Sequence, residues 1–233
     1  MKAFVIYVST SDKSVKSANR TQTIFKNNLN IDVSLFKGIN TDNVWQTFID
    51  SNFNILDVKR FGAGSIDAEI ATFFSHYNLW IKCLQLDTPI LILEHDAILN
   101  NTKIDSSILE NFKGDLLNLG EPNWGSFYYG NFKSEWLSKQ SGVRKREICK
   151  NEHDTYQIWN TADGLCHCDT LWLFGAHSYL LNPSGAIKLV EATKNGILPA
   201  DVYIRNGLLD IYDYLPHPVK QLEEFTLIQR WEK

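Results

Sequence analysis

Apolar and polar positions alternate along the chain in a way that predicts short strands separated by amphipathic helices. Residues 3–8 and 90–93 are continuous apolar runs, typical of strands covered on both faces. Residues 31–36 alternate and predict a further strand. Residues 65–87 carry apolar side chains every three or four positions, which predicts a helix with one broad buried face. A serine at its start is the expected N-cap, and Pro89 follows its end.

The same pattern predicts an α/β fold built around a mostly parallel sheet, because strands and helices alternate along the sequence. Strands are also expected at residues 115–120 and 176–182. Shorter helices are expected at residues 17–28, 43–53, 108–112 and 183–193, and the polar residues 9–16 are expected to form a loop.

One long stretch has no clean period. Residues 121–169 are rich in Trp, Tyr, Gly and Lys. An irregular stretch of this length inside a compact domain is usually functional. We therefore expect a single domain spanning residues 1–233, with an irregular insertion at about residues 121–169.

Composition narrows the possibilities further. The 233 residues include seven Trp and thirteen Phe, which favours a packed globular core over disorder. A formal net charge of -4 gives no general attraction to nucleic acid or to anionic membranes. The first apolar run is too short for a signal peptide, and no run approaches membrane-spanning length. Four cysteines predict a reducing, cytoplasmic compartment rather than a disulfide framework.

The apolar run 90–93 ends abruptly in Glu94-His95-Asp96. Acids at the carboxyl end of a buried strand lie where open α/β sheets bind ligands. In an extended segment, Glu94 and Asp96 would point to the same side. Their oxygens suit Mn²⁺ or Mg²⁺, so one acid could hold the metal while the other contacts a ribose or a water. The alternative interpretation is a strand-end turn with solvated acids.

The acids belong to a longer spaced pattern that resembles glycosyltransferase family 25, the lipopolysaccharide biosynthesis and procollagen galactosyltransferase group. The specific matches are Glu69, Ser75-His76, Trp80 and the Glu94-His95-Asp96 triplet. The triplet departs from the family in one position, because the family usually has Asp where this chain has His95. A looser match follows at Ala176, Tyr179, Gly185-Ala186 and Pro199-Ala200-Asp201.

The resemblance implies a Rossmann-like nucleotide-sugar transferase domain of the type called GT-A. It also implies transfer of a hexose, galactose being the example in the family, from a nucleoside diphosphate sugar to a hydroxyl on a glycan, lipid-linked or protein acceptor. The transfer would be metal-dependent and would invert the anomeric configuration. Two rival interpretations are a catalytically inactive relative that binds a glycan or a partner, and a glycosyltransferase that modifies nucleic acid.

Site residues follow from the same positions. Glu94 and Asp96 are the expected metal ligands, and the residues expected at the donor are Arg20, Glu69, His76 and Glu94. Asp201 is the candidate general base, with Glu121 and Asp163 as weaker alternatives. Each has a structural alternative. Arg20 could be a solvated helix residue, His76 a buried histidine satisfied by a neighbour, and Asp201 the N-cap of a helix beginning near Val202.

The resemblance implies that the irregular insertion at about residues 121–169 is the acceptor side, where aromatic rings can stack on sugar faces. The same insertion holds a second candidate site. Cys149, His153, Cys166 and Cys168 supply four ligands of the kind found in structural zinc sites, although their spacing matches no standard finger. Reduced free thiols are the alternative interpretation. A basic stretch from Lys139 to Lys150 in the same insertion could grip a diphosphate or an acidic acceptor, or could be a solvated face.

Overall fold

A computed structural model describes residues 1–55, 65–101, 103–121, 141–145, 157–160, 166–168, 173, 176–205 and 207–222. These residues form a seven-stranded sheet with the order β2-β1-β3-β9-β5-β10-β6. Its strands are β1 (Lys2–Tyr7), β2 (Asp32–Lys37), β3 (Ile90–Glu94), β5 (Leu116–Asn118), β6 (Gly142–Lys145), β9 (Ser178–Leu181) and β10 (Ile211–Leu215).

The sheet is mixed, with most of its strands running in one direction. Strands β1, β2 and β3 pair in parallel, as do β5 and β10. Strand β9 lies between β3 and β5 and is antiparallel to both, so β3 and β5 point the same way. The α/β class and the mostly parallel sheet are therefore confirmed. The reversed strand β9 brings its own amino end to the edge of the sheet where β3 ends.

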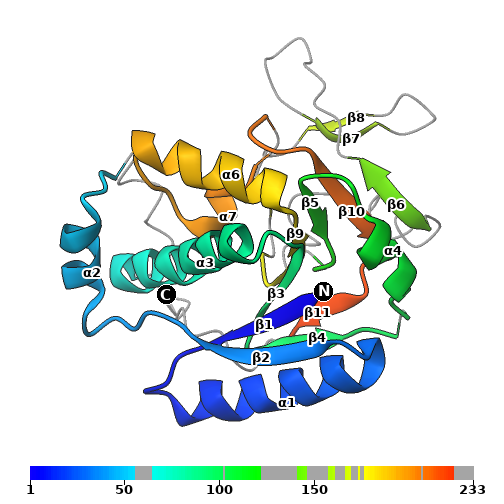
Figure 1. Cartoon of the computed structure of the whole chain (residues 1–233), viewed down its shortest axis with the longest axis horizontal. Coiled ribbons are helices and arrows are strands. Elements are labelled where there is room, and N and C mark those ends of the chain that lie inside the picture. Colours follow the sequence, from blue (N-terminus) through cyan, green and yellow to red (C-terminus); the bar gives the residue numbers. More distant parts are fainter. Residues whose placement is uncertain are drawn as a thin grey trace.

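Helices cover both faces of the sheet (Figure 1). They are α1 (Asp12–Leu29), α2 (Val44–Ser51), α3 (Ile66–Leu86), α4 (Ser106–Asn111), α6 (Pro183–Ala192) and α7 (Ala200–Tyr203), and a 3-10 turn, η2 (Thr193–Asn195), follows α6. All the helices in this described part of the chain are too short or too polar to cross a membrane.

Two hydrophobic cores result, because successive side chains of a strand point to opposite faces. On β1 and β3, Phe4 and Ile92 belong to the core that contains α3 and α6. Their neighbours Val5 and Leu91 belong to the core that contains α1. The continuous apolar character of β1 and β3 follows from burial on both sides.

Two features differ from the sequence prediction. Helix α1 begins at Asp12 because Ser11 caps it, its side chain accepting a hydrogen bond from the Ser14 amide. The predicted loop over residues 9–16 is therefore confirmed only for residues 9–11, and residues 12–16 are helical. The early turns of α1 bury small polar residues such as Ser14 and Ser17, which give no apolar period. A small strand β4 (Ala97–Leu99) was also not predicted, and it pairs antiparallel with β11 (Val219–Gln221).

Candidate active site

The candidate site begins at the carboxyl end of β3, where Glu94 is the last residue of the strand. The Glu94 amide donates to the carbonyl of His177, just before β9, at 2.8 Å. Its side chain is 24% exposed, and Oε1 lies 3.3 Å from Nε2 of His76 on α3. The buried strand end therefore presents a partly accessible carboxylate that a helix side chain holds from one side.

Tyr179 holds His76 from behind. Its hydroxyl lies 2.8 Å from His76 Nδ1 and 3.0 Å from Trp80 Nε1, and all three side chains are fully buried. An indole N–H can only donate, so the tyrosine oxygen accepts from Trp80 and its own O–H is available to His76 Nδ1. The other ring nitrogen, Nε2, faces Glu94, and an N–H there donates to the carboxylate. The Ser-His-x3-Trp pattern thus encodes a buried network that orients the imidazole.

Charge around Glu94 favours its ionised form. Burial raises the Glu94 pKa, but the hydrogen bond from His76 and the charge of His76 outweigh burial and lower it. His177 is itself buried, and burial lowers its pKa to about 4, so it is neutral at pH 7. The arrangement keeps a negative charge at the end of β3.

The pKa of Asp96 is shifted in the opposite direction. It is only 1% exposed, and burial, followed by the charge of Glu94, raises its pKa to about 7. Gln221 Nε2 donates to its Oδ2 at 2.7 Å, whereas the buried Oδ1 has no hydrogen-bond partner among the residues that the structure describes. The chain turns at His95–Asp96, so the prediction that both acids lie on one extended segment is wrong. The charge of Glu94 still acts on Asp96.

Helix α1 contacts the turn at His95–Asp96, here called the acid turn, from the other side of the sheet edge. The positive charge of Arg20 lowers the Asp96 pKa, and Arg20 Nη2 donates to Ser17 Oγ at 2.8 Å. Thr21 Oγ1 lies 2.8 Å from the carbonyl oxygens of both His95 and Ala97. The helix following β1 therefore contacts the backbone of the turn and carries an arginine whose charge acts on Asp96.

Asp201 joins the same cluster from α7. Burial raises its pKa, the charge of Glu94 raises it further, and the charge of His76 opposes this effect. Asp201 is not the N-cap of a helix, because α7 begins at Ala200 with Pro199 as its cap. Its carboxylate instead accepts the amide of Val202 at 2.9 Å. Glu94 and His76 thus act electrostatically on Asp201, although the three residues lie on segments far apart in sequence.

Two other predicted residues occupy different places. Glu69 is buried in the first turn of α3, seven residues or about 10 Å along the axis from His76. Glu121 has an exposed side chain, and its amide donates to the carbonyl of Val219 at 2.7 Å. Neither residue belongs to the hydrogen-bonded group formed by His76, Tyr179 and Glu94.

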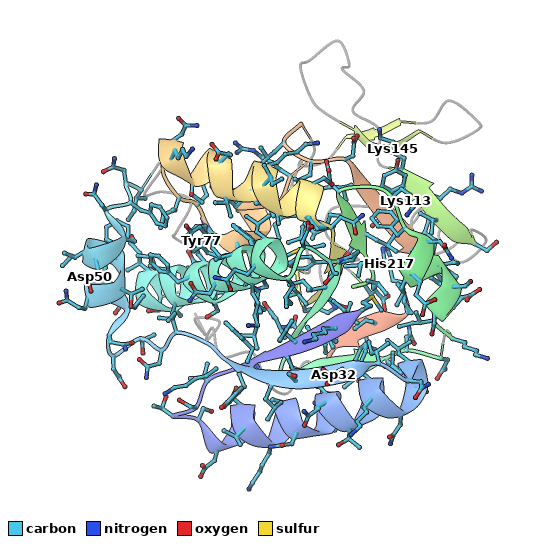
Figure 2. The ribbon with its side chains drawn as sticks, viewed as in Figure 1. Asp32, Asp50, Tyr77, Lys113, Lys145 and His217 are labelled. Carbon is cyan, nitrogen blue, oxygen red and sulfur yellow. The ribbon has the colours of Figure 1, made fainter. Side chains whose placement is uncertain are left out.

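Most residues of the insertion for which the sequence predicts a role lie outside the described residues. Asp163, Cys149 and His153 lie outside them, and Cys166 and Cys168 are described only as backbone of β8 (Cys166–Cys168), which pairs with β7 (Gln157–Asn160). Within the described ranges, no group of three His, Cys, Asp or Glu side chains is arranged to hold a metal by itself. Of the basic stretch, Lys145 pairs with Asp210 at 2.6 Å on the β6–β10 side of the sheet (Figure 2).

Ser75 shows why the residue before His76 matters. Its hydroxyl accepts the Ile39 amide at 2.9 Å and donates to the Ala71 carbonyl at 2.7 Å. A Cβ on Gly38 would lie 2.9 Å from Ser75 Oγ and 3.3 Å from the Tyr7 carbonyl, so the loop after β2 approaches α3 through a glycine. Ser75 and His76 each tie α3 to a different strand end.

Sequence reasoning assigned no site role to Tyr179, His177 or Gln221. Tyr179 and His177 do lie in a segment that the family resemblance covers loosely, but nothing in that segment indicates the partners of their side chains. Gln221 carries no sequence signal, since it lies beyond the last family motif. Farther along the same sheet edge, Asn118, Asp213 and His217 form a buried cluster, with Asn118 Nδ2 donating to Asp213 Oδ1 at 2.8 Å.

The acids, Arg20 and His76 lie together at the carboxyl edge of an open α/β sheet, and this arrangement defines an enzyme-like ligand site of that architecture. The chain itself belongs to glycosyltransferase family 25, described as LPS biosynthesis protein, whose family model matches residues 5–204. It is therefore a glycosyltransferase.

Comparison with solved structures and curated proteins adds two findings. The galactosyltransferase LgtC, solved in complex with donor and acceptor sugar analogues, is similar at 10% sequence identity and a TM-score of 0.46. The similarity covers 99% of this chain and 92% of that one. The sequence has no significant match among curated proteins.

Proposed function

We propose that the protein is a GT-A-type transferase that moves a hexose, galactose in the first instance, from a nucleoside diphosphate sugar to a hydroxyl acceptor. The observation that carries this proposal is that Glu94 ends β3 in contact with His76 while its charge acts on Asp96 and Asp201, in a chain of this family. The acceptor hydroxyl oxygen attacks the anomeric carbon, the bond from that carbon to the diphosphate breaks, and the hydroxyl proton passes to the enzyme.

A divalent cation, Mn²⁺ or Mg²⁺, fits Glu94 and Asp96. The two carboxyls repel each other, and Asp96 has a buried oxygen that accepts no hydrogen bond from the described residues. A bound cation would offset the repulsion between the carboxylates and would be a partner for the Asp96 oxygen. Carboxylate oxygens are the hard ligands that these metals prefer. When bound, it would neutralise the charge of the leaving diphosphate. Arg20, whose charge already acts on Asp96, is placed to assist on the donor side.

Asp201 is suited to accept the proton. Burial and the nearby Glu94 raise its pKa, which makes the carboxylate a stronger base than a solvated aspartate. A single base acting opposite the leaving group implies direct displacement and inversion at the anomeric carbon. His76 supports the reaction by holding Glu94, which sets the charge that Asp201 experiences.

The test is release of nucleotide from a panel of nucleoside diphosphate sugars, with and without Mn²⁺. Wild type is compared with Asp96→Asn and Asp201→Asn, which keep the side-chain shape and remove the charge. Asp32→Asn is the matched control, because Asp32 is an exposed aspartate at the amino end of β2, away from the site (Figure 2). NMR of the transferred sugar reports its anomeric configuration.

We expect release from one donor that requires Mn²⁺, a loss of at least about 100-fold in Asp201→Asn, and an unchanged Asp32→Asn. Asp96→Asn should raise the Mn²⁺ requirement. Full activity of Asp201→Asn would remove it as the base, and a retained anomeric configuration would refute direct displacement. A folded wild type that neither binds nor cleaves any donor would instead support a glycan- or partner-binding role.

A further inference from the structure

Gln221 contacts the acid turn from outside the part of the chain that defines the family. The family match ends at residue 204, whereas Gln221 is the last residue of β11. Its side-chain amide donates to Asp96 Oδ2 at 2.7 Å. The next residue, Leu222, donates its backbone amide to the Asp96 carbonyl at 3.0 Å. Two consecutive residues of the C-terminal segment therefore hold both the side chain and the backbone of Asp96.

We propose that Gln221 is a positioning residue that fixes the carboxylate of Asp96 for the divalent cation of the donor site. The inference rests on the proposed function. Gln221 acts through Asp96, and it makes the segment after residue 204 part of the working site.

The geometry of Asp96 supports this role. The side chain is buried, so its orientation depends on protein partners rather than on water. Gln221 occupies Oδ2, and Oδ1 is the oxygen that accepts no hydrogen bond from the described residues. A neutral amide fixes one oxygen without cancelling the negative charge that a cation requires. Residues that orient metal ligands in this way typically change metal affinity 10- to 100-fold when they are replaced.

The turn that contains Asp96 is held from a second direction. Thr21 on α1 lies within hydrogen-bond distance of the carbonyl oxygens of His95 and Ala97. The pairing of β11 with β4 places Gln221 opposite Ala97 and Lys220 opposite Ile98. The backbone of the turn is thus fixed on both sides, and Gln221 supplies the side-chain contact to the carboxylate.

Strand β11 also provides its own control. Side chains alternate along a strand, and Lys220 is exposed whereas Gln221 is half-buried against Asp96. Gln221→Met keeps the length of the side chain and removes the donor. Lys220→Met places the same residue one position earlier, on the solvent side. Gln221→Asn, which retains the amide but shortens its reach, is a second variant should the methionine impair folding.

The experiment measures Mn²⁺ affinity of the full chain by electron paramagnetic resonance, with Mn²⁺ alone as the ligand. The Mn²⁺ concentration for half-maximal nucleotide release and kcat at saturating Mn²⁺ are measured in parallel. We expect Gln221→Met and Gln221→Asn to weaken Mn²⁺ binding about 10- to 100-fold. Their kcat should largely recover at saturating Mn²⁺, and Lys220→Met should match wild type.

Three results would overturn the inference. Equal Mn²⁺ affinity in Gln221→Met and Lys220→Met, with an active wild type, leaves the proposed function standing and removes Gln221 from it. Equal weakening by both variants assigns the effect to the strand rather than to the amide. A wild type that binds no Mn²⁺ and releases no nucleotide overturns the proposed function itself, and this inference with it.

Discussion

Replacing Tyr179 with Phe tests the buried network that holds the site. The substitution removes one oxygen and leaves the ring, so its packing against the surrounding core is kept. His76 Nδ1 and Trp80 Nε1 lose the hydroxyl to which they are bonded at 2.8 and 3.0 Å. Both side chains are fully buried, so water cannot replace it without a rearrangement.

The magnitude follows from the two groups left without a partner. A buried donor or acceptor that loses its only partner costs about 1–3 kcal/mol. With partial relaxation, we expect the two to lower the free energy of unfolding by about 2–4 kcal/mol. For a chain of this size, that corresponds to a fall in Tm of roughly 4–16 °C. Activity should also fall, because the Tyr179 hydroxyl no longer orients the His76 imidazole that contacts Glu94.

The assay pairs thermal unfolding with nucleotide release measured well below Tm. Tyr214→Phe is the control, since the Tyr214 hydroxyl accepts the Asp105 amide at 3.0 Å and lies 3.4 Å from the Lys103 carbonyl, in the other core. It should lower Tm while leaving the activity of the folded protein near wild type. Tyr179→Phe should lower both, with a loss of activity of about 10-fold or more. Unchanged Tm and activity in Tyr179→Phe would refute the network.

Two further predictions concern the packing of α6 against β5. Burial raises the pKa of Asp115, but hydrogen bonds from Lys188, the Asp210 amide and Ser184 outweigh it and lower the pKa. Asp115 therefore adds stability above its unfolded pKa and loses it as pH falls through the folded pKa. Lys188→Met should reduce the stability lost between pH 6 and pH 3 in urea titrations, and an unchanged pH dependence would remove this pair as its source. Gly185→Ala should destabilise by about 1–3 kcal/mol, because its Cβ would lie 2.6 Å from the Asp115 carbonyl oxygen. A gain in stability, which alanine gives in an unobstructed helix, would contradict that contact.

The sequence predicted the fold well where one periodicity dominates. The run before Glu94 and the helix containing His76 were predicted nearly to the residue, because burial on both faces or on one broad face leaves a clear pattern. The start of α1 was missed because its buried residues are small and polar. The direction of β9 could not be predicted, since reversal changes strand pairing without changing which residues are apolar.

The site was predictable in part for a related reason. The spacing of residues on one helix or one strand indicated His76, Glu94 and Asp96 as candidates. The charges of Glu94 and His76 act on Asp201, the candidate base. Partners that arrive through tertiary contact leave no local pattern. Tyr179 looks like any buried strand residue, and Gln221 like any polar residue near a strand end. Glu69 shows the same limit, because helical spacing places it two turns from His76 on α3 but does not indicate what its side chain contacts.

The contacts that hold the turn at His95–Asp96 come from positions 21 and 221, which lie 200 residues apart in the sequence. A ribosome makes the chain from the amino end at about 5–20 residues per second, and domains generally fold as units during synthesis. The turn at His95–Asp96 can rest on α1 early, whereas Gln221 is made 125 residues after Asp96, at least about 6 s later. A nascent chain that has not reached residue 221 therefore has α1 and the turn without the strand that closes over Asp96. The side-chain contact to the Asp96 carboxylate should form only after that strand has been synthesised.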